Sequence, residues 1–258
     1  QAEIGLNEIR QYWPGGSSLV AATYYLIDGY RASSSDQHLR RAGELVLRWI
    51  RLPGAQFEEA GPRVKLGLAS ILIDGGFASE AASILAQAQT AARDLEDQFL
   101  DIGVSYFFAK AANAAGKHQD ALDSLDSIVE RYNDETFNGS YPDAPFVFVQ
   151  RAAAHRGLYE VDRSSQHLDA MSEDLTAALA ILDQRRRSLI FAGQVAPLFE
   201  RDYWATWLQY MELMKAQSMC ERVVQLIRSR RLMAGGEGSS FAPEALQVRF
   251  DQLEKDCQ

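Results

Sequence analysis

Two stretches of this 258-residue sequence repeat one another at an interval of 40 residues. Residues 68–88 and 108–128 place small residues, a glycine and large apolar residues in the same order. The matched pairs are Leu68 with Phe108, Ala69 with Ala109, Leu72 with Ala112, Gly76 with Gly116, Ala81 with Ala121, Leu85 with Leu125, and Ala88 with Ile128. A period of this length indicates one supersecondary unit that recurs along the chain. Each copy predicts a helix, a glycine turn and a second helix.

The small residues of the repeat predict how its two helices pack. On the first helix of each pair, Ala69 and Ala109 are expected where the two helices cross. On the second helix, Ala81 and Ala121 are expected at the same crossing. A large side chain at these positions would hold the two backbones apart. Leu85 and its equivalent would then fill the seam with the neighbouring helices. Alanines exposed to water, or a β-sheet in the middle of the molecule, would contradict this interpretation.

The sequence predicts helices in the rest of the chain as well. Ala, Leu, Glu, Gln and Arg dominate it, and runs of Val, Ile and Thr with period-two alternation do not appear. Most of the seven prolines fall where helices should begin or end. The predicted helices cover about 2–12, 19–31, 36–51, 57–74, 79–95, 97–115, 119–132, 146–158, 164–187, 195–216, 219–233 and 242–256.

These helices predict an all-α fold, an α–α superhelix built as a solenoid of antiparallel helix pairs. We assign residues 1–234 to one helical repeat domain. The glycine- and serine-rich segment 235–241 is expected to be a flexible linker, and residues 242–258 a C-terminal helix.

The repeated residues resemble the tetratricopeptide repeat, which implies a right-handed solenoid that binds a protein or peptide. Looser copies support the resemblance: Ala42, Val46 and Trp49, then Trp204, Leu208 and Met211, then Cys220, Val224 and Ile227. The chain departs from the family in lacking the proline that usually ends a repeat, and Asp94 and Asn133 stand near those places.

A narrower resemblance lies toward the C-terminal end. The order of segments 179–183, 185–187, 199–210 and 223–232 looks like the final repeats before a CHAT domain, a caspase-like peptidase module of larger bacterial proteins. The departure is at residues 225–227, where a glutamate would be expected. This resemblance implies that the chain is the non-catalytic helical part, without the His/Cys dyad, and regulates an attached effector.

The charge of the chain argues against nucleic-acid and membrane-surface binding. The sequence has 26 basic and 35 acidic residues, a formal net charge of −9, whereas both kinds of surface need an excess of Lys and Arg. The arginine runs at 185–187 and 228–231 lie at predicted helix ends, where cations favour the helix dipole. No run of 18 apolar residues predicts a membrane span.

Neither histidines nor cysteines form a recognisable site. The four histidines are scattered, and none belongs to an HExxH motif. No two of them share a helical face at a spacing of four residues, so we expect no metal or catalytic role. Cys220 and Cys257 belong to no CxxC motif or Cys/His cluster. We therefore expect a small buried side chain and a terminal thiol, not a zinc site or a disulfide framework.

Carboxylates form a stripe at Asp120, Asp123 and Asp126, which lie on one face of a predicted helix. A solvated face is the interpretation we favour, and a docking face for a basic partner is the alternative. Acid–base catalysis would need one buried carboxylate of a pair, and no pattern indicates one. We expect no catalytic residue, no cofactor and no metal.

A partner-binding groove follows from the repeat register, because the first helices of successive pairs line the concave face of a helical stack. Its expected residues are Arg63, Leu66, Ser70, Asp74, Tyr106, Lys110, Asn113, Gln150, Asp202 and Gln209. This mixture of aromatic and polar groups suits an extended or helical peptide.

The hypothesis from sequence is therefore a non-catalytic protein–protein interaction scaffold or sensor module. An all-α enzyme with a cavity inside the helical array is the alternative, and a buried carboxylate cluster or a His–carboxylate pair in one pocket would favour it. A helical regulatory domain of a transcription factor is a third hypothesis, but it requires a separate DNA-binding segment, which we do not find in this sequence. The oligomeric state stays open. A cytoplasmic location is favoured, with a periplasmic or secreted one if Gln1 follows a cleaved signal peptide.

Overall fold

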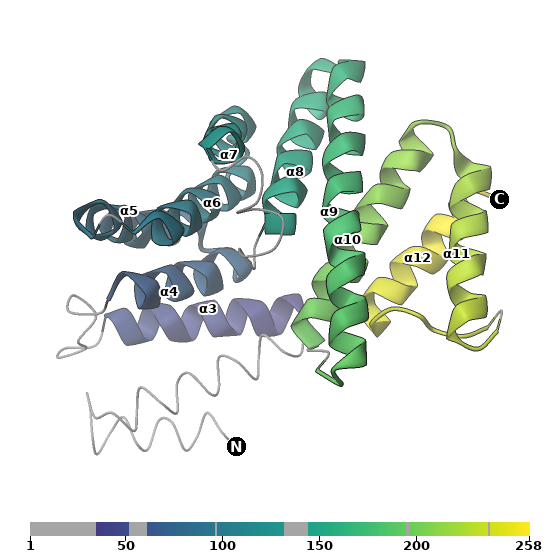
Figure 1. Ribbon diagram of the computed structural model, residues 1–258, viewed down its shortest axis with the longest axis horizontal. Helices are drawn as coiled ribbons and strands as arrows, with labels where there is room; N and C mark the ends of the chain where they lie inside the picture. Colours follow the sequence, from purple (N-terminus) through teal and green to yellow (C-terminus); the bar gives the residue numbers. More distant parts are fainter. Residues whose placement is uncertain (1–34, 52–60, 96, 132–143, 195–196, 237) are drawn as a thin grey trace. The chain divides into compact units, whose positions relative to one another are not determined.

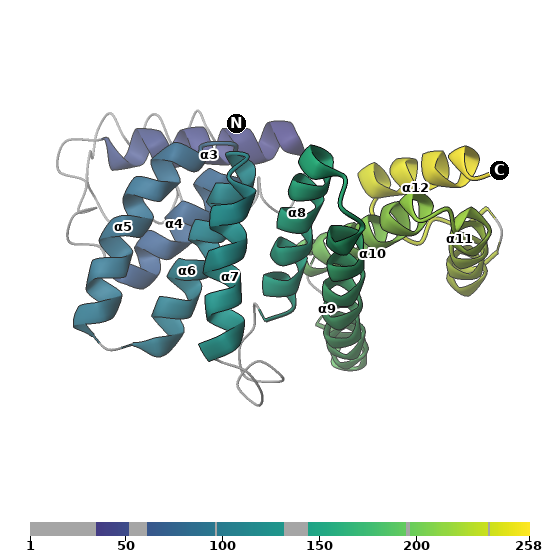
Figure 2. The ribbon, with the colours of Figure 1, turned by 90° about the horizontal axis from the view of Figure 1, so that it is seen from above.

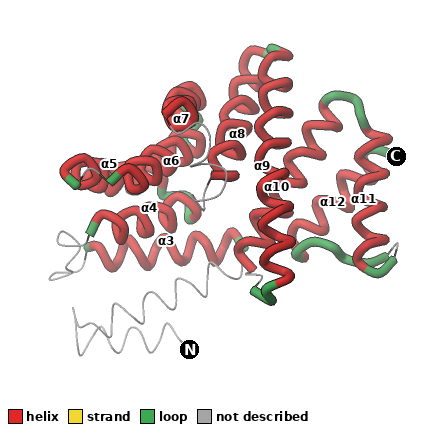
Figure 3. The backbone as a smooth tube through the Cα atoms, viewed as in Figure 1, coloured by secondary structure: helices red, strands yellow, loops and turns green. Residues whose placement is uncertain are grey.

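The computed structural model describes residues 35–51, 61–95, 97–131, 144–194, 197–236 and 238–258. Within these ranges every regular element is a helix, and no strand occurs (Figures 1 and 3). The prediction of an all-α fold is thereby confirmed. The helices predicted at 2–12 and 19–31 lie outside the described residues.

The helices match the predicted ones closely. They are α3 (Asp36–Ile50), α4 (Pro62–Asp74), α5 (Ala78–Asp94), α6 (Gln98–Ala114), α7 (His118–Arg131), α8 (Ala144–Asp162), α9 (Ser165–Phe191), α10 (Pro197–Ala216), α11 (Cys220–Ala234) and α12 (Glu244–Asp256). Local signals define several of their ends. The Asp97 carboxylate accepts a hydrogen bond from the backbone N–H of Leu100 at 3.1 Å and caps the start of α6.

The chain divides into two compact units, residues 1–131 and 132–258. The boundary falls inside the range that we had assigned to one repeat domain. Helix α12 packs on α10 and α11 inside the second unit.

In the first unit, helices α3 to α7 pack in chain order, each against the next (Figure 2). Helix α4 also contacts α6, so alternate helices meet as well as consecutive ones. Ala69, Ala81, Ala109 and Ala121 are all fully buried. The expectation that these alanines are not exposed to water is therefore confirmed, and a larger side chain at any of them would need space that a close-packed interior does not leave.

The two glycine turns of the repeat have the same backbone geometry. Gly76 and Gly116 adopt φ angles of +83° and +74°, a region that favours glycine. In each turn the residue after the glycine donates its N–H to a carbonyl five residues back: Phe77 to Leu72 and Lys117 to Ala112, both at 2.8 Å. This is the hydrogen bond of a Schellman motif, which ends one helix and starts the next within three residues.

In the second unit, α8 packs on α9, α9 on α10, and α10 on both α11 and α12. The turn between α10 and α11 repeats the geometry of the glycine turns without a glycine. Ser218 has a φ of +63°, and Met219 N–H donates to the Met214 carbonyl at 2.9 Å. The core of this unit is aromatic. It gathers Tyr203, Trp204 and Trp207 of α10 with Phe250 of α12 and Leu182 of α9.

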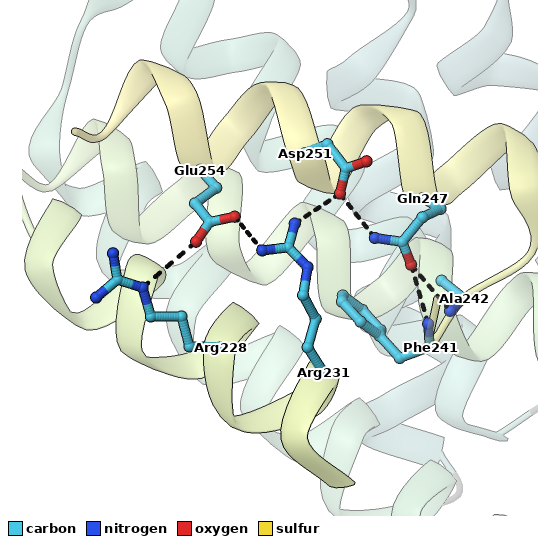
Figure 4. Close-up of polar contacts among 7 residues, drawn as sticks. All are labelled: Arg228, Arg231, Phe241, Ala242, Gln247, Asp251 and Glu254. Atoms are coloured by element: carbon cyan, nitrogen blue, oxygen red, sulfur yellow. Dashed lines mark hydrogen bonds and ion pairs between the residues drawn. The ribbon is translucent and has the colours of Figure 1, made fainter. Parts of the chain in front are cut away.

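Helix α12 is held on α11 by a polar clamp (Figure 4). The Arg231 guanidinium donates to Asp251 at 2.7 Å and also to Glu254, which Arg228 approaches at 3.6 Å. Gln247 donates to Asp251 at 2.8 Å, and its carbonyl oxygen accepts the backbone N–H of Phe241 at 3.0 Å. The two arginines of α11 bind carboxylates of α12, and Gln247 ties α12 to the segment that precedes it, so the cluster stabilises the packing of α12 on α11.

A disulfide joins Cys220, at the start of α11, to Cys257, just after α12. Their Cα atoms lie 4.9 Å apart, a usual separation for this bond. The expectation of a buried side chain and a terminal thiol was wrong. A spacing of 37 residues carries no local signal, because the two cysteines meet only when α11 and α12 pack together.

Candidate functional site: a groove in the second unit

A hollow of about 440 Å³ lies among α8, α9, α10 and α12. Its apolar lining consists of Ala152, Ala153, Leu168, Met171, Ala205, Leu213 and Ala216. Its polar lining consists of Arg156, Tyr159, Glu160, Arg163, Gln209, Glu212 and Arg249. We call this hollow the groove.

Short side chains on facing helices explain why the groove exists. Ala153 of α8 and Ala205 of α10 present only methyl groups to it. Between them, Met171 of α9 and Leu213 of α10 are buried and contribute to its apolar lining. Apolar surface with a few polar groups at its edge is the usual composition of a ligand site.

Both carboxylates of the groove are paired with arginines. Glu212 accepts hydrogen bonds from Arg156 at 3.2 Å and from Arg249 at 2.7 Å. Glu160 lies 3.5 Å from the Arg156 guanidinium. Each groove carboxylate is therefore engaged by at least one guanidinium, and Glu212 by two.

Arg163 stands at the turn between α8 and α9, with a φ of +59°. Its guanidinium carbon lies 5.4 Å from the centre of the Tyr159 ring, a cation–π distance. Within the part of the chain that the structure describes, this guanidinium makes no ion pair. The groove therefore carries one cation whose charge is not neutralised by a neighbouring carboxylate.

The structure places the ten residues predicted for a partner-binding groove in different environments. Gln209 lies in the lining described above. In the same unit, Gln150 is half-buried on α8 and Asp202 pairs with Arg201 at 2.6 Å. Arg156, Arg163 and Arg249 were not predicted: the repeat register did not select the first two, and no local pattern brings Arg249 of α12 beside α10.

In the first unit, the predicted residues mostly make contacts between helices. Arg63 pairs with Asp97 at 3.2 Å, Asp74 with Lys110 at 2.6 Å, and Asn113 lies 3.3 Å from His118. Leu66 packs against the core, while Ser70 and Tyr106 are buried. The last two side chains thus offer little surface to a partner.

Two histidines that the sequence did not relate meet across the α8–α9 turn. The Nδ1 atoms of His155 and His167 are 3.1 Å apart, and His167 Nε2 lies 3.2 Å from an Asp162 oxygen. A neutral His167 that donates to Asp162 accepts at Nδ1, so His155 donates to it. The ring centres are 5.3 Å apart, so the two nitrogens point almost directly at each other. A metal ion bound by both would lie off that line, so the geometry fits an N–H···N hydrogen bond better than metal ligation.

A second hollow, of about 400 Å³, lies along α3 and includes His38 and Glu44. Glu44 is paired with Arg41 at 2.8 Å and lies 3.8 Å from Arg40. Its carboxylate is thus engaged with arginines, like those in the groove. In the ranges with described coordinates, no group of three or more His, Cys, Asp or Glu side chains could hold a metal ion.

Tyr203, in the aromatic core of the second unit, has a raised pKa. Burial, followed by its hydrogen bond to Asp183 at 2.7 Å, raises the pKa of Tyr203 from 10.0 to about 12. Between pH 10 and 12 the unfolded chain has lost this proton and the folded chain keeps it. Stability therefore falls as the pH rises through this window, by about 1.4 kcal/mol per pH unit.

We expect denaturant unfolding to show this loss between pH 9.5 and 11.5 in the wild type and a smaller loss in Tyr203→Phe. Other tyrosines and lysines titrate in both proteins, so the difference between the two isolates Tyr203. Equal losses in both proteins would show that the Tyr203 hydroxyl does not keep its proton in the fold.

No helix in the described ranges is both long and apolar enough to cross a membrane. No family model, curated protein or solved structure matches the chain.

Proposed function

We propose that the chain is a non-catalytic interaction module whose second unit holds a segment of a partner protein in the groove. The observation that carries this proposal is the groove itself, an alanine-lined hollow of about 440 Å³ edged by arginines. Interfaces gain most of their affinity where an anchor side chain enters such a pocket and excludes water. The pairing of both groove carboxylates with arginines supports binding over acid–base chemistry.

The tetratricopeptide-like organisation belongs to the same proposal. Buried alanines and leucines that recur at an interval of 40 residues, and two glycine turns with the same hydrogen-bond pattern, support a stack of equivalent helix pairs in the first unit. A stack of this kind presents a continuous surface to a partner, and through it the module would regulate an attached or associated effector.

Filling the groove tests the proposal. Peptides are selected on the whole chain from a random display library and their affinities measured by fluorescence anisotropy. Ala216, at the end of α10, is exposed and lines the groove. We expect Ala216→Trp to weaken the selected peptides at least about tenfold, because the indole would occupy the space of a buried anchor.

Ala180→Trp is the matched control, because Ala180 is an exposed alanine of α9 outside the groove lining. Ala153→Trp fills the groove from α8 without adding charge, and it shows whether the effect of the first variant is only local. The proposal fails if no peptide is enriched, or if the groove variants bind as well as Ala180→Trp while all proteins melt alike.

A further inference from the structure

The space in the groove suits a large apolar side chain. The small side chains of Ala153 and Ala205 leave space in the groove. The buried side chains of Met171 and Leu213 give this space an apolar wall. About 440 Å³ is near the lower end of the range for small-ligand pockets, about 300–1,000 Å³. A leucine or aromatic side chain of a partner would remove this surface from water.

The charge around that space is positive, although the whole chain is strongly acidic at −9. The lining holds three arginines and two glutamates, which leaves one positive charge. Arg156 and Arg249 share the Glu212 carboxylate, Arg156 also lies near Glu160, and the two arginine side chains are 52% and 57% exposed. Each guanidinium has five N–H donors in a planar fork, so both retain donors for a further acceptor.

Arg163 adds an anion site at the α8–α9 turn. It makes no ion pair with any residue of known position, and its guanidinium rests on the Tyr159 ring. An arginine placed on an aromatic face in this way still presents its donors edge-on, where a carboxylate binds with two parallel hydrogen bonds.

We infer that the segment bound in the groove carries a large apolar anchor flanked by aspartate or glutamate. This inference rests on the proposed function, since it specifies the occupant of the same groove. A basic segment would bring its cations against a lining with a net positive charge. Nucleic acid would also supply negative charge, but the acidic chain as a whole would repel its phosphates.

The peptide selection described above tests the inference separately from the proposed function. We expect the enriched sequences to combine a leucine or aromatic residue with acidic neighbours. Enriched sequences without acidic residues that still depend on Ala216 would overturn the inference and leave the proposed function standing. No enrichment at all would overturn both.

A charge reversal provides the matched measurement. Arg163→Glu should weaken the acidic peptides about tenfold at low salt, with a smaller effect at high salt as the charges are screened. Arg187→Glu makes the same change at an exposed arginine of α9 outside the groove lining, so it should leave binding within about twofold. Equal effects of the two variants, or displacement of the peptides by a single-stranded oligonucleotide, would contradict an acidic peptide as the occupant.

Discussion

Reduction of the Cys220–Cys257 disulfide should lower the free energy of unfolding of the second unit by about 4 kcal/mol. The bond closes a loop with a sequence separation of 37 residues, and it restricts the unfolded chain far more than the folded one. This is among the largest single contributions that the structure identifies, because a domain has only about 5–15 kcal/mol of net stability.

The folded position of α12 should survive reduction. Phe250 is fully buried, Leu253 is nearly so, and Arg231 still links α11 to Asp251 and Glu254. The disulfide is therefore expected to change the denaturant midpoint while leaving the groove residue Arg249 in place beside Glu212. Peptide affinity should change little under conditions where the reduced chain is still folded.

Urea unfolding with and without dithiothreitol, followed by tryptophan fluorescence, measures the effect. Trp204 and Trp207 lie in the core of the second unit and report its unfolding. A Cys220→Ser/Cys257→Ser double variant is the control, and it should match the reduced wild type and be insensitive to the reductant. Two readily alkylated thiols in the native protein, or an equal response of the double variant, would show that the bond does not form.

The disulfide also bears on the compartment in which the chain works. Disulfides persist in oxidising compartments and are rare in the cytosol, where thiols are kept reduced. In a reducing environment the second unit would lack this stabilisation. The bond between Cys220 and Cys257 therefore weighs against the cytoplasmic location that the sequence had favoured.

The fold of the described residues was largely predictable because its signals are local. Helix α6 was predicted at 97–115 and runs from Gln98 to Ala114, since Asp97 caps it and Gly116 ends it. The prediction was poorer for α8, which was expected to end at residue 158. Gly157 is buried in the interior of this helix, which continues to Asp162. Packing against α9 outweighs the low helix propensity of a glycine there.

The candidate site was less predictable because it depends on which helices become neighbours. The repeat register placed Gln209 in a groove, but it said nothing of Arg249, which reaches the groove only because α12 packs on α10. The contact of His155 with His167 is another example. Twelve residues separate them, so no helical face joins them, and the turn between α8 and α9 brings the rings together.

Leu85→Ala and Leu125→Ala should each lower the free energy of unfolding of the first unit by about 3 kcal/mol. The two leucines are equivalent in the repeat, and both are fully buried. Truncation removes the transfer free energy of three carbons and leaves a cavity that the rigid helix pairs fill only in part. Because the two sites have the same place in the repeat, we expect the two losses to differ by less than about 1 kcal/mol.

The control is Leu95→Ala, because this leucine is 63% exposed just after α5, and its loss should cost no more than about 0.5 kcal/mol. Trp49 lies in the core of the first unit, and transitions of that unit should be insensitive to dithiothreitol. Only the unfolding transition of the second unit should respond to dithiothreitol, because the disulfide lies there. If the leucine variants shift only the other transition, their effect lies in the first unit. If Leu125→Ala lowered the free energy of unfolding no more than Leu95→Ala, the seam between successive helix pairs would not be packed at this position. The repeat would then be a similarity of sequence without equivalent packing. It would no longer support a stack of helix pairs.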